Sequence, residues 1–257
     1  MSNYVEDLFS LAGRTALVTG ASSGIGRQMS QALASAGAEV VLVARREDRL
    51  AEVVHHISDG GGGAVALPGD LGQREDITRI AAEAAKFYGA PDILVNAAGI
   101  NPRQPTAEVS WDTWDATLHL NLSVPFFLAR ALVPGMQAKG GGNIINIASL
   151  QSFRAFADGA PYGASKSGVV QLTRAMAEAW SNTGIVANAI VPGFFKTELT
   201  SSIFEDPDKV QHHAGMTAVG RNGELADLDG ATVFLASRAA AYITGQVLPV
   251  DGGYTAK

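Results

Sequence analysis

Residues Thr15-Ala-Leu-Val-Thr-Gly-Ala-Ser-Ser-Gly-Ile-Gly26 join a short apolar run to a glycine-rich turn. The run Thr15–Thr19 predicts a buried strand, and the residues after the turn predict a helix over about Gly24–Ala36. Because glycines let the backbone approach a phosphate, and a helix N-terminus offers free N–H groups, the turn favours a phosphate-bearing ligand. A glycine turn alone is a weak signal, since tight strand-to-helix connections also use glycine.

Strand-like and helix-like patterns alternate along the rest of the chain. Further strands are predicted at Glu39–Val43, Ala64–Leu67, Asp92–Asn96, Asn143–Ala148, Ile185–Ile190 and Gln246–Val250. Further helices are predicted at Arg46–Ile57, Gln73–Tyr88, Trp111–Met136, Pro161–Ser181 and Glu224–Ser237, with Pro125 expected to bend the third. The strands lack a polar face, which indicates burial on both sides by helices. The pattern predicts an α/β, Rossmann-type, doubly wound parallel sheet of about seven strands with helices on both faces.

Ligands of doubly wound sheets bind beyond the carboxyl ends of the strands. The chemically distinctive residues follow there: Gly20–Gly26 comes after the first strand, Asp70 after the third and Asn96–Gly99 after the fourth. Ser149 and Pro192-Gly193 follow the fifth and sixth strands. Their shared edge predicts an enzyme.

Tyr162 and Lys166 are four residues apart on a predicted helix, so their side chains share a face. A phenol ordinarily ionises near pH ~10, and a neighbouring ammonium stabilises its phenolate. The pair is therefore suited to general acid/base catalysis near neutral pH. Each residue alone has an ordinary structural interpretation, as has Ser149 as a turn residue or Asn121 as a buried amide. Their occurrence together favours catalysis.

Taken together, these motifs resemble the short-chain dehydrogenase/reductase family over roughly residues 8–253. The matching elements are Thr19-Gly20-x-x-x-Gly24-Ile25-Gly26, Asn96-Ala97-Ala98-Gly99, Asn121, Ser149, Tyr162-x-x-x-Lys166, Pro192-Gly193 and Asp251-Gly252-Gly253. Ala97 departs from the pattern, because the family often has a second asparagine there. The resemblance implies an NAD(P)(H)-dependent oxidoreductase that interconverts a secondary alcohol and a ketone.

The resemblance also implies roles for individual residues. Tyr162 is expected to donate or accept the proton, and Lys166 to lower its pKa and hold the nicotinamide ribose. Ser149 is expected to hydrogen-bond the substrate oxygen, and Asn121 to hold a water that links Lys166 to solvent. Cofactor contacts are expected from Gly20, Ser22, Ser23, Gly24, Ile25, Gly26, Asp70, Leu71, Asn96, Ala97, Ala98, Gly99, Pro192, Gly193, Phe195 and Thr197, besides Tyr162 and Lys166. Asp70 would bind the adenine amino group, with a helix N-cap as its alternative.

The end of the second strand bears on which cofactor is used. NAD-binding sheets usually place an acid there for the ribose 2′-hydroxyl. This chain has Ala44 followed by Arg45 and Arg46, whose guanidinium forks suit a 2′-phosphate. NADP(H) is therefore favoured, with NAD(H) use left open. The alternative is that both arginines begin a solvated helix.

Residues from about 194 to 216 predict a mobile substrate lid, because they carry Phe194, Phe195, Phe204 and Met216 among polar residues. The alternative is a packed surface helix. Ser149–Phe153 and Pro192–Thr197 resemble members that act on sugar acids, such as gluconate 5-dehydrogenases, so a sugar acid, polyol or small ketone is the expected substrate.

Two other functions remain open. A 3-oxoacyl-[acyl-carrier-protein] reductase is disfavoured by Ala177, which stands where such enzymes commonly carry a basic residue. A non-catalytic nucleotide-sensing regulatory protein would normally lack part of the catalytic set.

Composition narrows the remaining classes. The 257 residues carry a net charge of −6 and no cysteine. These features predict a single domain over 1–257, a small-molecule substrate, and no nucleic-acid or membrane partner. The N-terminus lacks the pattern of a secretory signal, so a cytoplasmic location is expected. No metal is expected, since His55-His56 and His212-His213 fit a solvated surface. The family resemblance implies a homotetramer built through helices near 111–136 and 161–181 and the last strand.

Overall fold

A computed structural model describes residues 3–257. Within these residues a parallel sheet has seven strands in the order β3-β2-β1-β4-β5-β6-β7. Their bounds are β1 (Thr15–Thr19), β2 (Glu39–Ala44), β3 (Ala64–Pro68), β4 (Ile93–Asn96), β5 (Gly142–Ile147), β6 (Ile185–Pro192) and β7 (Val247–Val250). The order reverses between β1 and β4, which places a ligand crevice at their carboxyl ends. The predicted Rossmann-type sheet is confirmed.

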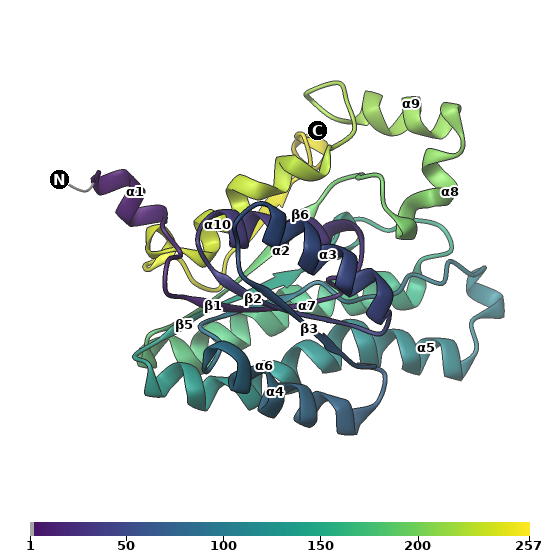
Figure 1. Cartoon of the computed structure of the whole chain (residues 1–257). Helices are drawn as coiled ribbons and strands as arrows, with labels where there is room; N and C mark the ends of the chain where they lie inside the picture. Colours follow the sequence, from purple (N-terminus) through teal and green to yellow (C-terminus); the bar gives the residue numbers. More distant parts are fainter. Residues whose placement is uncertain (1–2) are drawn as a thin grey trace.

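Helices cover both faces of the sheet (Figure 1). In that view α2 (Gly24–Ser35), α3 (Glu47–Asp59) and α10 (Asp229–Ala236) lie above it, and α4 (Arg74–Tyr88), α6 (Val124–Ala138) and α7 (Ala160–Trp180) lie below. The helices on each face pack against the sheet and bury a separate apolar cluster. Along β1, Ala16 and Val18 face the first cluster, whereas Leu17 faces the second. This alternation explains why the strands read as continuous apolar runs.

The long predicted helix over 111–136 is interrupted. It consists of α5 (Trp111–Leu118), a π-helical turn at His119–Ser123, and α6. The Val124 N–H bonds the His119 carbonyl, five residues back. Pro125 lies in the first turn of α6, so the irregularity precedes the proline that was expected to bend the helix. Since Pro125 has no N–H, the Asn121 carbonyl four residues earlier receives no α-helical bond from it.

Among residues 3–257, the stretch Trp111–Ala138 is long and apolar enough to cross a membrane by length and composition. Much of its apolar surface is used inside this protein. Leu128, Leu132 and Met136 are buried in the second cluster, where α6 packs against α4 and β5. The composition of the stretch is therefore that of a core helix, with a further apolar face left outside.

The segment expected to form the lid leaves the sheet after β6. It contains α8 (Ser201–Phe204) and α9 (Pro207–Met216), which rise beyond the carboxyl edge at the upper right of Figure 1. No residue of α9 is buried, and α8 buries only Ile203. The remaining helix, α1 (Tyr4–Phe9), lies at the opposite side near the N-terminus. The predicted last helix over Glu224–Ser237 begins as a 3₁₀ turn at Leu225–Leu228 and continues as α10.

Candidate active site

A cavity of about 720 Å³ opens at the carboxyl edge of the sheet. Its volume falls within the range of small-molecule sites. It is lined by Ser149, Tyr162 and Lys166 and by all but one of the predicted cofactor contacts: Gly20, Ser22, Ser23, Gly24, Ile25, Gly26, Arg45, Arg46, Asp70, Leu71, Ala97, Ala98, Gly99, Pro192, Gly193, Phe195 and Thr197. The exception is Asn96.

Asn96 lies inside the protein rather than at the cavity. Its Nδ2 donates to Asn146 Oδ1 at 2.8 Å, and Asn146 Nδ2 donates to Thr173 Oγ1 at 2.9 Å. These buried amides join β4, β5 and α7. The Asn96 side chain does not line the cavity, because its position in the pleat faces α7, so a cofactor contact of Asn96 stays a prediction. Asn96 therefore supports the site from behind.

The glycine turn fits a phosphate cradle. Gly20 and Gly24 have φ of +66° and +53°, a region that favours glycine. A Cβ on Gly20 would lie 2.9 Å from the Ala98 Cα, so a side chain there would displace the neighbouring loop. That loop is fixed by Thr19, whose Oγ1 accepts the N–H groups of Ala97 and Ala98 at 3.0 and 3.1 Å. The glycine turn and the loop after β4 are thus held against each other at the base of the cavity.

Asp70 is also placed by a local turn. Its Oδ1 accepts the Gly72 N–H at 3.0 Å, and its own N–H donates to Asp76 Oδ2 at 2.7 Å. The N-cap of α4 is Gln73, so Asp70 is not the helix cap that was its alternative. The carboxylate lies at the cavity wall next to Leu71, where an adenine ring was expected.

Tyr162 and Lys166 occupy the first turns of α7 and are both buried. Lys166 Nζ lies 5.7 Å from the Tyr162 ring centroid and donates to the Ile147 carbonyl at 2.7 Å. Burial raises the pKa of Tyr162, while a hydrogen bond with Ser149 and the charge of Arg103 act to lower it. Burial lowers the pKa of Lys166 to about 8. The expected fall in the tyrosine pKa through Lys166 is therefore not seen here, because desolvation dominates.

Asn121 lies in the π-helical turn, behind the cavity. Its Oδ1 accepts the Ile100 N–H and its Nδ2 donates to the Ile100 carbonyl, both at 2.9 Å, and Nδ2 also contacts Ser165 Oγ at 3.1 Å. The side chain thus clamps the loop after β4 to α7. Because the side-chain amide of Asn121 already has these partners, the predicted water would have to be held by the backbone carbonyl of Asn121.

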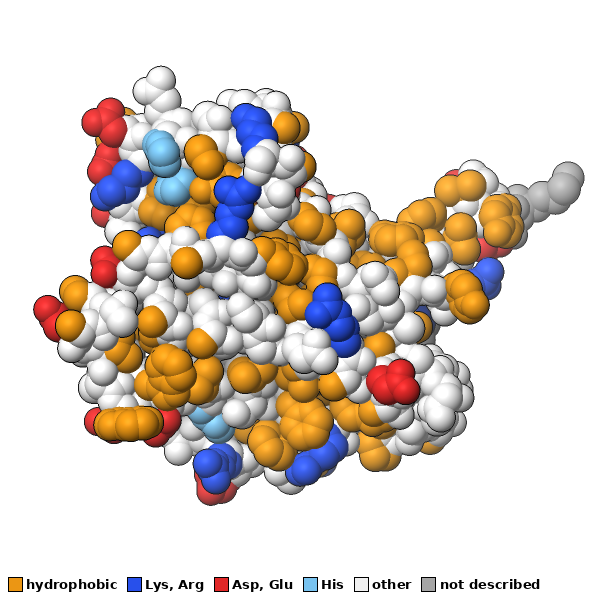
Figure 2. Space-filling view, turned by 180° about the vertical axis from the view of Figure 1, so that it is seen from behind, with side chains coloured by type: hydrophobic (Ala, Val, Ile, Leu, Met, Phe, Trp, Pro, Cys, Tyr) orange, Lys and Arg blue, Asp and Glu red, His pale blue; other side chains and the backbone are white. Residues whose placement is uncertain are grey.

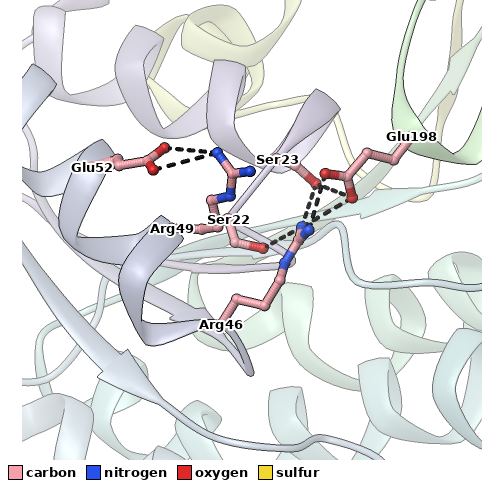
Figure 3. Close-up of polar contacts among 6 residues, drawn as sticks. All are labelled: Ser22, Ser23, Arg46, Arg49, Glu52 and Glu198. Atoms are coloured by element: carbon pink, nitrogen blue, oxygen red, sulfur yellow. Dashed lines mark hydrogen bonds and ion pairs between the residues drawn. The ribbon is translucent and has the colours of Figure 1, made fainter.

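The two arginines after β2 are placed differently. The Arg46 side chain forms hydrogen bonds to Ser22 Oγ and Ser23 Oγ, both at 3.0 Å, and a two-pronged ion pair with Glu198 (Figure 3). Arg45 lines the cavity and is exposed. Only Arg46 is therefore held against the glycine turn.

Several cavity residues were missed from the sequence. Arg103 and Asp158 are the only non-glycine residues among those described that have positive φ, +43° and +59°, and both line the cavity. The Gln104 N–H donates to the Asp158 carbonyl at 3.2 Å, so their loops lie side by side. Such backbone conformations concentrate at functional sites. The position of Arg103, four residues after Gly99, was the available signal.

His213 also belongs to the cavity, contrary to its prediction as a surface residue. Its ring stacks on Phe194 with centroids 3.7 Å apart, and burial lowers its pKa. Lys209, from the same helix α9, lines the cavity too. No cluster of three or more metal-ligating side chains occurs within the part of the chain that is described.

A Rossmann-type sheet with a glycine cradle, and with Ser149, Tyr162 and Lys166 at one cavity, defines a nucleotide-dependent oxidoreductase. The chain belongs to the short-chain dehydrogenase/reductase family, whose members interconvert secondary alcohols and ketones with NAD(P)(H). The matching family model, described as enoyl-(acyl carrier protein) reductase, covers residues 20–255.

Individual relatives are similar over nearly the whole chain. Gluconate 5-dehydrogenase of Gluconobacter oxydans is 40% identical, with 97% of each chain covered. The 2-dehydro-3-deoxy-D-gluconate 5-dehydrogenase of Bacillus subtilis is 38% identical, with 99% of each covered. The crystal structure of a gluconate 5-dehydrogenase from Burkholderia cenocepacia, in complex with NADP and tartrate, matches with a TM-score of 0.94, 39% identity, and coverage of 99% of this chain and 100% of that one.

Proposed function

We propose that this enzyme interconverts a secondary hydroxyl and a ketone on a sugar acid or closely related hydroxy acid, using NADP(H). The observation that carries the substrate class is Arg103. It lines the cavity and lies near enough to Tyr162 for its charge to act on the phenol pKa. Lys209 and His213 line the same cavity. A carboxylate can pair with a guanidinium while a neighbouring carbon reacts. The names of the relatives given above support this class.

The chain's own residues supply proton transfer and orientation. Bound nicotinamide would supply or accept the hydride. The Ser149 hydroxyl hydrogen-bonds the substrate oxygen and aligns it with Tyr162. Because burial raises the pKa of Tyr162, the phenol is protonated at neutral pH and can donate its proton during ketone reduction. Lys166 lies beneath it and contributes a nearby positive charge. A water that donates a hydrogen bond to the Asn121 backbone carbonyl would return the proton from solvent.

The cofactor preference rests on the residues at the end of β2. A 2′-phosphate placed between Arg46 and the hydroxyls of Ser22 and Ser23 would meet one charged fork and two donors. No acid occupies position 44, where a carboxylate would repel the phosphate. NADP bound in the Burkholderia relative supports the same preference. NAD(H) is expected to react less efficiently.

Steady-state assays of the full chain test this function. NADP⁺ and NAD⁺ are each offered gluconate, galactitol, tartrate and a neutral secondary alcohol, and the matching ketones are offered with the reduced cofactors. Appearance or loss of reduced nicotinamide absorbance gives kcat/KM. We expect the highest value for a sugar acid with NADP⁺ or its keto form with NADPH. Higher values for a neutral ketone, or for a 3-oxoacyl thioester, would contradict the proposed substrate class.

We further propose a homotetramer, in which the outer faces of α5, α6 and α7 form one interface. Apolar side chains gather on the lower part of the molecule, which carries α5 and α6 (Figure 2). Trp111 and Phe127, on these helices, are 81% and 41% exposed. Light scattering after size exclusion should give the mass of four chains, and Phe127→Asp should reduce it. A cytoplasmic location is also proposed, since the chain has no cysteine and needs no oxidising compartment to fold.

The segment over about 194–216 is proposed to act as a lid on the same single domain, 1–257. Phe194, Phe195, Ile203 and His213 face the cavity, while α9 has no buried residue. A segment with an inner apolar face and little packing of its own can open and close over a substrate.

A further inference from the structure

Glu198 occupies the place where a 2′-phosphate would be recognised. Its two carboxylate oxygens pair with the two terminal nitrogens of Arg46, each at 3.0 Å. Ser23 Oγ donates to the same carboxylate at 3.2 Å. In Figure 3 the Glu198 carboxylate reaches the Arg46 guanidinium from the upper right, beside the Ser23 hydroxyl, and the Ser22 hydroxyl lies to the left of the guanidinium. Glu198 thus uses the donors that the proposed function gives to the phosphate.

The position of Glu198 in the chain makes this contact notable. It lies 152 residues from Arg46, within the proposed lid and directly after Thr197. Thr197 itself lies against the glycine turn, since its Cγ2 would be 3.2 Å from a Cβ on Gly24. The lid is therefore joined to the adenosine end of the cofactor site through a charged pair, and not only to the substrate end.

We propose that Glu198 is a specificity-determining residue, which competes with the cofactor 2′-phosphate for Arg46 and so sets the degree of preference for NADP(H) over NAD(H). This inference rests on the proposed binding of the phosphate at Arg46. The Nη1–Nη2 edge of Arg46 that Glu198 occupies cannot make the same two-pronged pair with a phosphate at the same time, and a phosphate beside an ionised carboxylate is repelled. The Arg46 pairing also lowers the pKa of Glu198, which keeps the carboxylate charged at neutral pH.

The pair is weak enough to be exchanged. Its side chains are 43% and 62% exposed, and ion pairs of that exposure contribute little to stability. A dianionic phosphate that also receives the two serine hydroxyls can therefore replace Glu198. NAD(H) lacks the phosphate and leaves the pair in place. Glu198 then weakens the binding of NADP(H) but not of NAD(H), which makes the affinities for the two cofactors more similar.

Calorimetric titration with adenosine 2′,5′-bisphosphate and with 5′-AMP tests the proposal without any substrate. The variants are Glu198→Gln, Arg46→Ala and the double variant. The matched control is Glu52→Gln, which removes the same charge from the Arg49 pair shown in Figure 3 without touching Arg46. Glu198 is exposed, so Glu198→Gln is expected to fold normally, which its melting temperature checks.

We expect Glu198→Gln to bind the bisphosphate about three- to tenfold more tightly and 5′-AMP within about twofold of wild type. Glu52→Gln should match wild type for both ligands, and Glu198→Gln should have no effect in the Arg46→Ala background. Unchanged or weaker bisphosphate binding, equal tightening of both ligands, or a gain that persists without Arg46 would overturn the proposal. If Arg46→Ala leaves the affinity for the bisphosphate unchanged, the 2′-phosphate does not bind at Arg46 and the proposal is overturned. The substrate assays described above test the substrate class, and their outcome does not depend on this measurement.

Discussion

The ammonium of Lys166 lies under the phenol of Tyr162, 5.7 Å from the ring centroid, and is bonded to the Ile147 carbonyl at the end of β5. The lysine is thus fixed to the sheet, while the tyrosine presents its hydroxyl to Ser149 and the cavity. This arrangement separates the residue proposed to transfer the proton from the residue proposed to supply positive charge. The two can therefore be distinguished by mutation.

Tyr162→Phe should lower kcat by at least about 10²-fold, because it removes only the transferable proton. Dissociation constants for NADP⁺, measured by fluorescence titration, should stay within a few fold of wild type. Tyr242→Phe is the control, since Tyr242 is fully exposed. Turnover within about tenfold of wild type would show that another group transfers the proton.

Lys166 should make stability depend on pH. Burial lowers its pKa from 10.5 to about 8, so the folded protein binds fewer protons than the unfolded chain between these values. Stability attributable to this group therefore rises as pH increases from about 8 toward 10.5 and is lost as pH falls through about 8. Relative to Lys166→Met, wild type should gain up to about 3 kcal/mol across that window. Urea unfolding near each end measures the gain, and exposed Lys196→Met should show none.

Arg103→Gln should raise KM for an acidic substrate by about 10- to 100-fold, the loss expected for a charged hydrogen bond. kcat/KM for a neutral ketone should change by less than about threefold, because no carboxylate is recognised there. Arg238→Gln serves as the control, because Arg238 is exposed and lies in neither the cavity nor the proposed helical interface. A parallel loss for acidic and neutral substrates would assign Arg103 to the loop's conformation instead.

Arg46→Ala should reduce the preference for NADPH over NADH by at least about tenfold in kcat/KM, since two charged hydrogen bonds to phosphate are lost. Arg45→Ala should have a smaller effect, because Arg45 lines the cavity without contacting the serine hydroxyls. A preference for NADH in the wild-type enzyme, or an unchanged preference in Arg46→Ala, would refute the phosphate assignment.

Hydrogen exchange should reveal the proposed lid. No residue of α9 is buried, so its backbone amides should exchange rapidly without cofactor. Adding NADP⁺ and a slow substrate should protect the region over 198–216, while amides of β1 and β5 remain slow throughout. If α9 is as protected as β5 in the absence of cofactor, it is a packed surface helix.

Much of the fold was predictable because strand burial leaves a direct mark on the sequence. The seven predicted strands differ from the observed ones by at most about two residues at either end, in line with usual boundary uncertainty. The π-helical turn was not predictable, because a local pattern does not reveal which carbonyl Val124 bonds. The cavity-lining residues that follow a strand as part of a motif were predicted from the sequence. The side chain of Asn96 was not predicted to turn away from the cavity, because motif membership does not say on which side of the pleat a side chain falls.

The residues missed at the site share a cause. Arg103, His213 and Glu198 reach the cavity through loops and short helices, and their partners lie far away in the chain. The Phe194–His213 stack and the Arg46–Glu198 pair depend on how the chain after β6 folds back over the sheet. No periodicity encodes such a return. Arg103 alone carried a signal, since it follows the predicted loop after β4.

The single hydroxyl of Thr19 ties the first strand to both amides that follow β4, and it also donates to the Val95 carbonyl at 3.3 Å. A substitution that removes this hydroxyl would therefore disturb β1 and the loop after β4 together. The loops that bear Arg103 and Asp158, and the helix α9 that bears His213, lie outside the sheet. Substitutions in these segments are expected to alter the substrate end of the cavity while the sheet stays intact. Two relatives about 40% identical to this chain are named for different substrates, gluconate and galactitol. Such a difference is expected if the segments at the substrate end vary more readily than the nucleotide-binding turn.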